Sequence, residues 1–299
     1  MAALAAAWLS APAWATGTEG SACPPPGETR VSLQALKATE WRLPGIDAPQ
    51  RRQDLALALV GCLSHADPVL RDELAFEALW AWMRAGQLAA TTLQALRQRL
   101  LPVLARPADA AGFAQPFAAL ALAELARVDR LRAFLSATER GELAEHAARY
   151  LAGVRDYRGF DANNGWRHGV AHGADLALQL LLNPRLERPQ ADALVAAIAL
   201  QVLPDGTHFY RHGEGTRLMT PVYYLARSAL WQQADWSAWF DALLARLGPP
   251  TPTTEAGLAR RHNLGAFMLP LYAAVQEHGD ADTRARLLPG LRKALQALR

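Results

Sequence analysis

Helical periodicity recurs along almost the whole chain, and the alternating apolar and polar pattern of strands is nearly absent. The clearest helix is predicted from Asp67 to Gly86. Asp67 can cap its first amides, Pro68 suits the first helical position, and Gly86 can end it. One broad face of this helix is apolar, with Leu70, Leu74, Ala78 and Trp82 in register. The sequence therefore predicts a helix that other elements cover on most sides.

Eleven further segments show the same pattern, and the connections between them are short and rich in Pro, Gly and Asp. Their predicted bounds are Ser32 to Trp41, Asp47 to Ser64, Thr91 to Leu104, Asp109 to Val128, Ser136 to Val154, Trp166 to Leu182, Pro189 to Leu203, Glu214 to Trp231, Asp235 to Leu247, Thr253 to Glu277 and Ala281 to Leu298. Helices joined by short loops pack antiparallel to their neighbours. We therefore expect an all-α array of antiparallel helix hairpins, either an open α-solenoid or a closed α/α toroid. No linker divides the chain, so residues 16–299 are expected to form a single helical domain.

The N-terminal segment has the composition of a signal peptide. Ala3 to Trp14 is apolar, and Ala13-Trp14-Ala15 is a small-x-small cleavage pattern, so residues 1–15 are predicted to be removed. The usual basic start is missing, so either the true start codon lies upstream or this segment is only an apolar tail. Export would make the protein periplasmic or secreted, and without a signal peptide it would be cytoplasmic. No other run is long enough to predict a membrane span.

Two cysteines follow the apolar segment. In an oxidising compartment Cys23 and Cys62 could form a disulfide, and otherwise Cys62 would be an ordinary buried thiol. The net charge is only +3, and the arginines are spread along the chain instead of forming a basic stripe. This argues against nucleic acid as a partner.

Polar residues concentrate between Arg155 and Asp175. If the helix begins near Trp166, His168, His172 and Asp175 project from one helix face, because residues three and four apart are neighbours on a helix. Two imidazoles and a carboxylate could bind a divalent metal. In the structural alternative, the histidines are buried and hydrogen-bonded to Asp156, Asp161 or Asp175, while Arg158 and Arg167 pair with the remaining carboxylates. The Glu of the zincin motif is replaced by Gly169, so a zincin-type protease is excluded.

A second polar region runs from Pro204 to Arg217. Its turn residues lead into Glu214, which is expected at a helix N-terminus, where its negative charge is stabilised. Either this is only a capped loop, or it lies over His168 and contributes side chains to a shared cleft. The side chains it could contribute are His208, Tyr210, Glu214 and Arg217.

Two further groups have structural interpretations. The aromatic group Trp231, Trp236, Trp239 and Phe240 could stack on sugars, but its helical spacing favours packing in the core. His262 and Asn263 lie on a long apolar helix and matter functionally only if they face the same cleft as His168.

Several of these residues carry a resemblance to a known family. The succession Asp156-x-Arg158-Gly159, followed by Gly165-Trp166-x-His168-x-x-Ala171-His172-Gly173-x-Asp175, resembles the hallmark of an uncharacterised bacterial family, domain of unknown function 2785. Gly213-Glu214 with Arg217, and Arg261-His262-Asn263 leading into Phe267 and Leu271-Tyr272, are similar to that family too. The resemblance spans roughly the C-terminal two thirds. It implies a helical fold and no particular reaction.

Three functions fit these observations. The first is a binding or scaffold module that uses a polar cleft around His168, His172 and Asp175 to hold a peptide, an envelope component or a glycan. The second is a metal-dependent hydrolase, with those three residues as the ligands of a possible divalent metal. The third is a polysaccharide-active enzyme on a toroid, which would use Asn163, Asn164, His168, Tyr210 and Arg217. The candidate site residues are Asp156, Arg158, Asp161, His168, His172, Asp175, Glu214 and Arg217.

Overall fold

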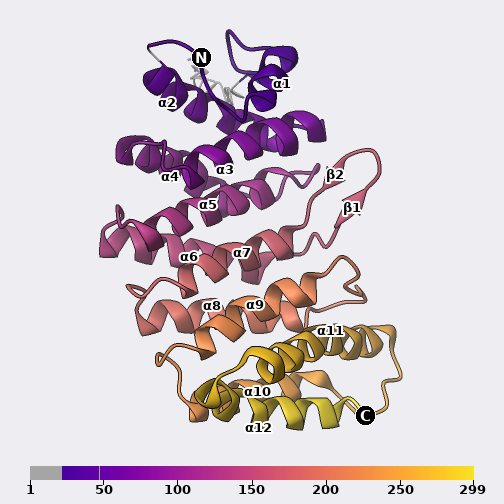
Figure 1. The fold of residues 1–299 in the computed structure, drawn as a ribbon. Coiled ribbons are helices and arrows are strands. Elements are labelled where there is room, and N and C mark those ends of the chain that lie inside the picture. The colour runs from indigo at the N-terminus through magenta and orange to yellow at the C-terminus, as the bar shows by residue number, and fades with distance from the viewer. Residues whose placement is uncertain (1–21, 47) are drawn as a thin grey trace, which may run out of the picture.

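The computed structural model describes residues 22–46 and 48–299, and in this part the helices stack into an open array (Figure 1). The first half contains α1 Arg30–Ala38, α2 Ala48–Leu59, the 3-10 helix η1 Val60–Ser64, the π-helix η2 Val69–Phe76, α3 Glu77–Arg84, α4 Ala90–Ala105, α5 Ala114–Leu131 and α6 Ala137–Gly153. The second half contains strands β1 Phe160–Asp161 and β2 Gly165–Trp166, then α7 Gly169–Leu181, α8 Arg188–Val202, α9 Glu214–Ala226, α10 Gln233–Leu247, α11 Glu255–His278 and α12 Ala281–Ala297. The predicted signal peptide, residues 1–15, lies outside the described residues.

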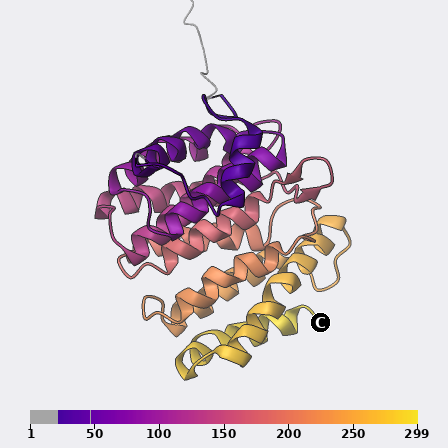
Figure 2. The same ribbon diagram turned by 45° about the horizontal axis from the view of Figure 1, so that its top comes forward.

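The helices form two layers because most of them pack on the helix two places along the chain. In one layer α3 contacts α5, α5 contacts α7, α7 contacts α9, and α9 contacts α11. In the other layer α4 packs between α2 and α6, α6 contacts α8, and α10 contacts α12. Consecutive helices therefore run antiparallel, which confirms the expected array of helix hairpins. The first and last helices lie at opposite ends of the stack (Figures 1 and 2), so the array is an open solenoid and the toroid alternative is wrong.

The predicted helix from Asp67 to Gly86 forms, with one departure from ideal geometry. Asp67 Oδ1 accepts a hydrogen bond from the Val69 amide at 2.9 Å, and Gly86 ends the helix with a φ of 67°. Leu70, Leu74, Ala78 and Trp82 are all buried, as the apolar face predicted. The first two turns are a π-helix, a form that often marks a local constraint.

Arg71 lies within this π-helix and is fully buried. It donates hydrogen bonds to the His65 and Ala66 carbonyls and, at 2.7 Å, to the carbonyl of Asn164. Its guanidinium also lies 3.9 Å above the Phe113 ring. Arg71 thus connects the N-terminal helices to the segment that contains the two short strands.

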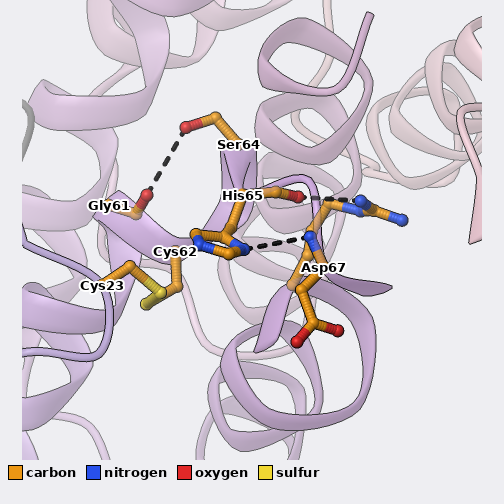
Figure 3. The surroundings of a disulfide bond; sticks show 7 residues. Cys23, Gly61, Cys62, Ser64, His65 and Asp67 are labelled. Carbon is orange, nitrogen blue, oxygen red and sulfur yellow. Dashed lines mark hydrogen bonds between the residues drawn. A yellow bond between two sulfur atoms is a disulfide. The ribbon is translucent and has the colours of Figure 1, made fainter. Parts of the chain in front are cut away.

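Cys23 and Cys62 form a disulfide, which settles the alternative left open by the sequence (Figure 3). The bond ties the segment before α1 to η1. Beside it, Asp67 N donates to His65 Nδ1 at 3.0 Å, so the turn that leads into η2 is held next to the crosslink. The disulfide therefore stabilises the N-terminal end of the array.

The aromatic group of α10 and the turn before it is part of the core. Trp231, Trp236, Trp239 and Phe240 are all buried, and Trp236 and Phe240 are fully so. This confirms that the group packs in the core, so these four rings are not exposed to stack on a sugar. Across residues 22–46 and 48–299, none of the helices has the length and apolar character needed to cross a membrane.

Candidate functional site

The polar run after α6 forms a small hairpin at one edge of the array (Figure 1). Phe160 pairs with Trp166 and Asp161 with Gly165 in antiparallel register. Asp161 organises the turn, because its Oδ1 accepts from the amides of Asn163 and Asn164 at 2.9 and 2.7 Å. We call residues 157–168 the hairpin segment.

Arg167 fastens the hairpin segment to the rest of the molecule. Its Nη1 donates to Asp161 at 2.6 Å, and its Nε donates to the Ala111 carbonyl at 2.7 Å. The hydrogen bond from Arg167 is the main reason that the pKa of Asp161 is well below its ordinary value. The guanidinium also lies 4.6 Å from the Phe113 ring, which the Arg71 guanidinium contacts as well.

His168 links the hairpin segment to the loop before α9, residues 204–213, which we call the α9 loop. His168 has a left-handed backbone with φ 58° and precedes the first residue of α7, so the helix starts three residues later than predicted. Its ring stacks on Trp166 at 4.5 Å. Its Nε2 lies 3.1 Å from the His212 carbonyl oxygen and donates to it. Burial lowers the pKa of His168, which favours the neutral ring.

The α9 loop is also held from the other side by α11. Asn263 accepts from the Tyr210 amide at 2.8 Å and donates to the His208 carbonyl at 2.9 Å. His262 Nε2 donates to the Tyr210 carbonyl at 2.9 Å. Glu214, the first residue of α9, is buried and accepts from the His212 amide at 2.9 Å. The residues that carry the family resemblance therefore anchor this loop between α7 and α11.

His172 lies in the interior and contacts α5. Its Nδ1 donates to the Pro116 carbonyl at 3.2 Å, and its ring packs edge-on against Phe117 at 5.3 Å. Burial lowers the pKa of His172 to about 3, so it is neutral near pH 7. Both His168 and His172 thus use backbone carbonyls as partners, and the expected hydrogen bonds to Asp156, Asp161 or Asp175 are wrong. The expected pairing of Arg158 and Arg167 with carboxylates is right.

The three candidate metal ligands do not converge. The rings of His168 and His172 are 5.9 Å apart, but both carboxylate oxygens of Asp175 bind Arg217 of α9. Burial raises the pKa of Asp175, and Arg217 opposes that shift. No group of three His, Cys, Asp or Glu side chains within the described residues is arranged to hold a metal ion. The proposed toroid-enzyme set is also dispersed, since the Tyr210 hydroxyl is buried and donates to the Gln201 carbonyl.

An open cleft of about 550 Å³ lies between the hairpin segment and the α9 loop, and we call it the polar cleft. The hairpin segment contributes Tyr157, Arg158, Asp161 and Arg167 to its walls, and the α9 loop contributes His208, Arg211 and His212. His172 and Asp175 are not part of this lining. The space therefore lies beside the predicted helix face and not on it.

Three polar atoms on side chains that line the polar cleft are buried and have no hydrogen-bond partner in the described part of the chain. They are Tyr157 Oη, His208 Nε2 and His212 Nδ1. The Tyr157 and His208 rings stack at 5.0 Å, which holds both in place. His212 Nδ1 is 3.7 Å from Glu214 Oε1, beyond hydrogen-bond range. Burial lowers the pKa of His208 and raises that of Tyr157, so both side chains are neutral near pH 7.

Two of the three arginines that line the polar cleft are paired with a carboxylate among the described residues, and the third is not. Arg158 is paired with Asp156, and Arg167 with Asp161. The exposed Arg211 side chain makes no hydrogen bond or ion pair with any described residue, and is available to a ligand. The sequence pointed to the loop and to His208, but Tyr157, Arg211 and His212 were not among the candidates. Their only sequence signal is their position beside the two Gly- and Asp-rich turns.

Comparison with protein families finds one whose model matches residues 100–273, more than half of the chain. The matched range covers the hairpin segment, the α9 loop and most of α11. Comparison with curated proteins and with solved structures finds no match for this chain. The chain belongs to the family described as protein of unknown function DUF2785.

Proposed function

We propose that this protein is a binding module that uses the polar cleft to hold an acidic carbohydrate. The observation that carries this proposal is the set of three buried, unpaired polar atoms on Tyr157, His208 and His212. Burying such atoms without partners costs about 1–3 kcal/mol each, so a ligand toward whose oxygens these side chains turn relieves that cost. Arg211 adds a guanidinium that no described residue pairs with, and this group is the one best suited to a carboxylate.

Two exposed aromatic rings favour a carbohydrate over other acceptor-rich ligands. Phe160 and Trp166 are 52% and 39% exposed, and their ring centroids lie 5.1 Å apart on the hairpin. Phe160 lies on the wall of the polar cleft. Exposed rings of this kind present apolar surface beside polar groups, a combination that suits the alternating C–H and hydroxyl surfaces of a sugar ring. An acidic peptide is the competing ligand class.

An oxidising compartment is part of the proposal. The Cys23–Cys62 disulfide supports it, because such bonds persist in the periplasm or outside the cell. The glycan would then be an envelope or extracellular one. The metal-dependent hydrolase has less support, because the donor atoms of its three proposed ligands are directed to other partners.

The test is titration calorimetry with three probes: oligogalacturonate, a neutral glucose oligosaccharide of equal length, and an oligoglutamate peptide. We expect binding of the first, with affinity at least 10-fold weaker for the neutral sugar. Tyr157→Phe removes a hydroxyl that has no partner among the described residues, so it should weaken binding without lowering stability. Arg211→Ala should weaken binding further.

Arg132→Ala is the matched control, because Arg132 is also exposed, also has no side-chain partner in the described residues, and lies outside the polar cleft. Its binding should equal that of the unaltered protein. Preference for oligoglutamate would replace the carbohydrate by an acidic peptide. Absence of binding by all three probes, or equal binding by the Arg211 and Arg132 variants, would contradict the proposal.

A further inference from the structure

A second cavity, of about 440 Å³, shares no lining residue with the polar cleft. It lies where the C-terminal ends of α4 and α6 meet the N-terminal ends of α5 and α7. Its volume falls within the range of small-molecule sites in proteins. We call it the α4–α7 cavity.

Much of the wall of the α4–α7 cavity is apolar. Leu104, Pro107, Pro116 and Val154 contribute hydrocarbon surface. The polar groups among them are already engaged: Gln115 Nε2 donates to the Leu104 and Arg106 carbonyls, and the Tyr150 hydroxyl donates to the Gly169 carbonyl. The wall therefore suits an apolar body.

Both carboxylates of the wall are bound by protein groups. Asp109 accepts from the amides of Gly112, Phe113 and Ala114 at the start of α5. Asp156 accepts from the Arg158 side chain and from the Arg158 amide. These interactions occupy both acidic groups within the cavity wall.

The three guanidinium groups of the wall have no carboxylate partner within it. Arg106 makes no side-chain hydrogen bond or ion pair with any described residue. Arg155 uses only Nη1, which donates to the Ala152 and Val154 carbonyls. Arg149 has an exposed pair with Glu145 at 3.4 Å, outside the cavity, and such pairs are weak. Cationic donors are thus in excess over available carboxylates.

We propose that the α4–α7 cavity binds a small amphiphilic carboxylate, with its hydrocarbon body against the apolar wall and its anionic group at the arginines. Charge-assisted hydrogen bonds from guanidinium to carboxylate would fix the head group. Burial of the hydrocarbon would supply most of the affinity. This site is independent of the proposed function of the polar cleft.

The test uses decanoate as the probe, measured by titration calorimetry below its micellar concentration. Decanol has the same hydrocarbon chain without the carboxylate, and acetate has the carboxylate without the long hydrocarbon chain. We expect decanoate to bind at least 10-fold more tightly than either. Arg106→Gln together with Arg155→Gln should reduce decanoate affinity about 10-fold and leave decanol unchanged.

A second variant fills the space. Gly153, the last residue of α6, lines the cavity, and a Cβ there would meet no atom of the described residues within 4 Å, so Gly153→Leu can extend into the cavity without a clash. Leu also has the higher helix propensity. We expect an unchanged or higher melting temperature and loss of decanoate binding.

Arg211→Ala, in the polar cleft, should leave decanoate binding unchanged, and this separates the two sites. Failure of decanoate to bind the unaltered protein, or equal binding by Gly153→Leu, would overturn the proposal. If Gly153→Leu lowers the melting temperature, the test is the single variant Arg106→Gln, because Arg106 is exposed and its substitution should not affect folding. Unchanged affinity in Arg106→Gln would then overturn the proposal.

Discussion

Gly159 and His212 lie so close that the imidazole of His212 occupies the space where a side chain on Gly159 would begin. The contact joins the hairpin segment to the α9 loop, 53 residues later in the sequence. The His212 ring lines the polar cleft, and its Nδ1, which has no hydrogen-bond partner among the described residues, packs against Gly159. The spacing of these two segments is therefore set by the absence of one methyl group.

Gly159→Ala should push His212 away and open the junction. Overpacking of this kind costs about 1–3 kcal/mol in the free energy of unfolding, and binding in the polar cleft should weaken as well. Urea denaturation and calorimetry measure the two effects. Gly153→Ala is the matched control, because its Cβ meets nothing within 4 Å. Equal stability of both variants would mean that the contact does not hold the loop.

The buried His172 should make the protein sensitive to acid. Its pKa is about 3 in the folded state and ordinarily 6.5, so the unfolded chain takes up the proton first. The stability that depends on neutral His172 is complete above pH 6.5 and is lost progressively toward pH 3, by about 4–5 kcal/mol. His172→Asn can retain the hydrogen bond to Pro116, so it should be less stable at pH 7 but lose less stability on acidification. Urea denaturation from pH 7 to pH 4 measures the slopes, and equal slopes would contradict the assignment.

Metal ions should not change the stability of the protein. Asp175 is paired with Arg217, and His172 Nδ1 is bound to the Pro116 carbonyl, so neither group is directed at a common ion. The melting temperature should stay the same after EDTA treatment and after addition of zinc. Elemental analysis is the independent check. Near-stoichiometric metal, with a zinc-dependent melting temperature that His172→Ala abolishes, would restore the metal-dependent hydrolase.

Asp129 should be one of the residues on which folding depends most. Its carboxylate accepts from Arg140 Nε at 2.8 Å, from Asn183 Nδ2 at 2.9 Å, and from the Leu135 amide at 2.9 Å. Burial raises its pKa, but the hydrogen bond from Arg140 and those from backbone amides outweigh burial, so the net shift is downward. Asp129→Ala leaves Arg140 buried without its partner and should cost about 3–5 kcal/mol at pH 7.

The Asp129 contribution also has a definite pH dependence. Because the folded pKa is lowered, this stability is present above the ordinary carboxyl range and is lost as the pH falls below about 3.8. The difference between Asp129→Ala and the unaltered protein should therefore shrink in strong acid. Glu145→Ala, which removes an exposed ion pair with Arg149, should change stability by less than about 0.5 kcal/mol at either pH. A similar cost for both variants would contradict the network.

Loss of the disulfide should loosen the N-terminal end of the array. The bond closes a loop with a sequence separation of 39, for which chain entropy gives about 3–4 kcal/mol. Paired Cys23→Ser and Cys62→Ser substitutions should lower stability by that amount. Reduction of the unaltered protein with dithiothreitol should have the same effect, and it should leave the doubly substituted protein unchanged. A stability unaffected by reductant would contradict this role.

The fold was largely predictable because its signals are local. Caps and apolar spacing such as those of Asp67, Gly86 and Trp82 act within a few turns of the chain, and short loops leave antiparallel packing as the available arrangement. The start of α7 was misplaced because His168 takes a left-handed backbone, which its contacts with Trp166 and His212 hold in place. The contact with His212 joins residues far apart in the sequence, so no local sequence pattern predicts it.

The sequence by itself determined the helices, their antiparallel order and the polar character of the two segments around His168 and Glu214. Only the tertiary structure decided which polar groups form hydrogen bonds or ion pairs within the described part of the chain and which do not. Asp175 and Arg217 are 42 residues apart and neutralise each other, whereas Tyr157 and His208 stack with polar atoms that no described residue pairs with. The physical reason is that helix formation depends on neighbours three and four residues away. The pairing of a buried polar atom instead depends on which distant helix packs against it.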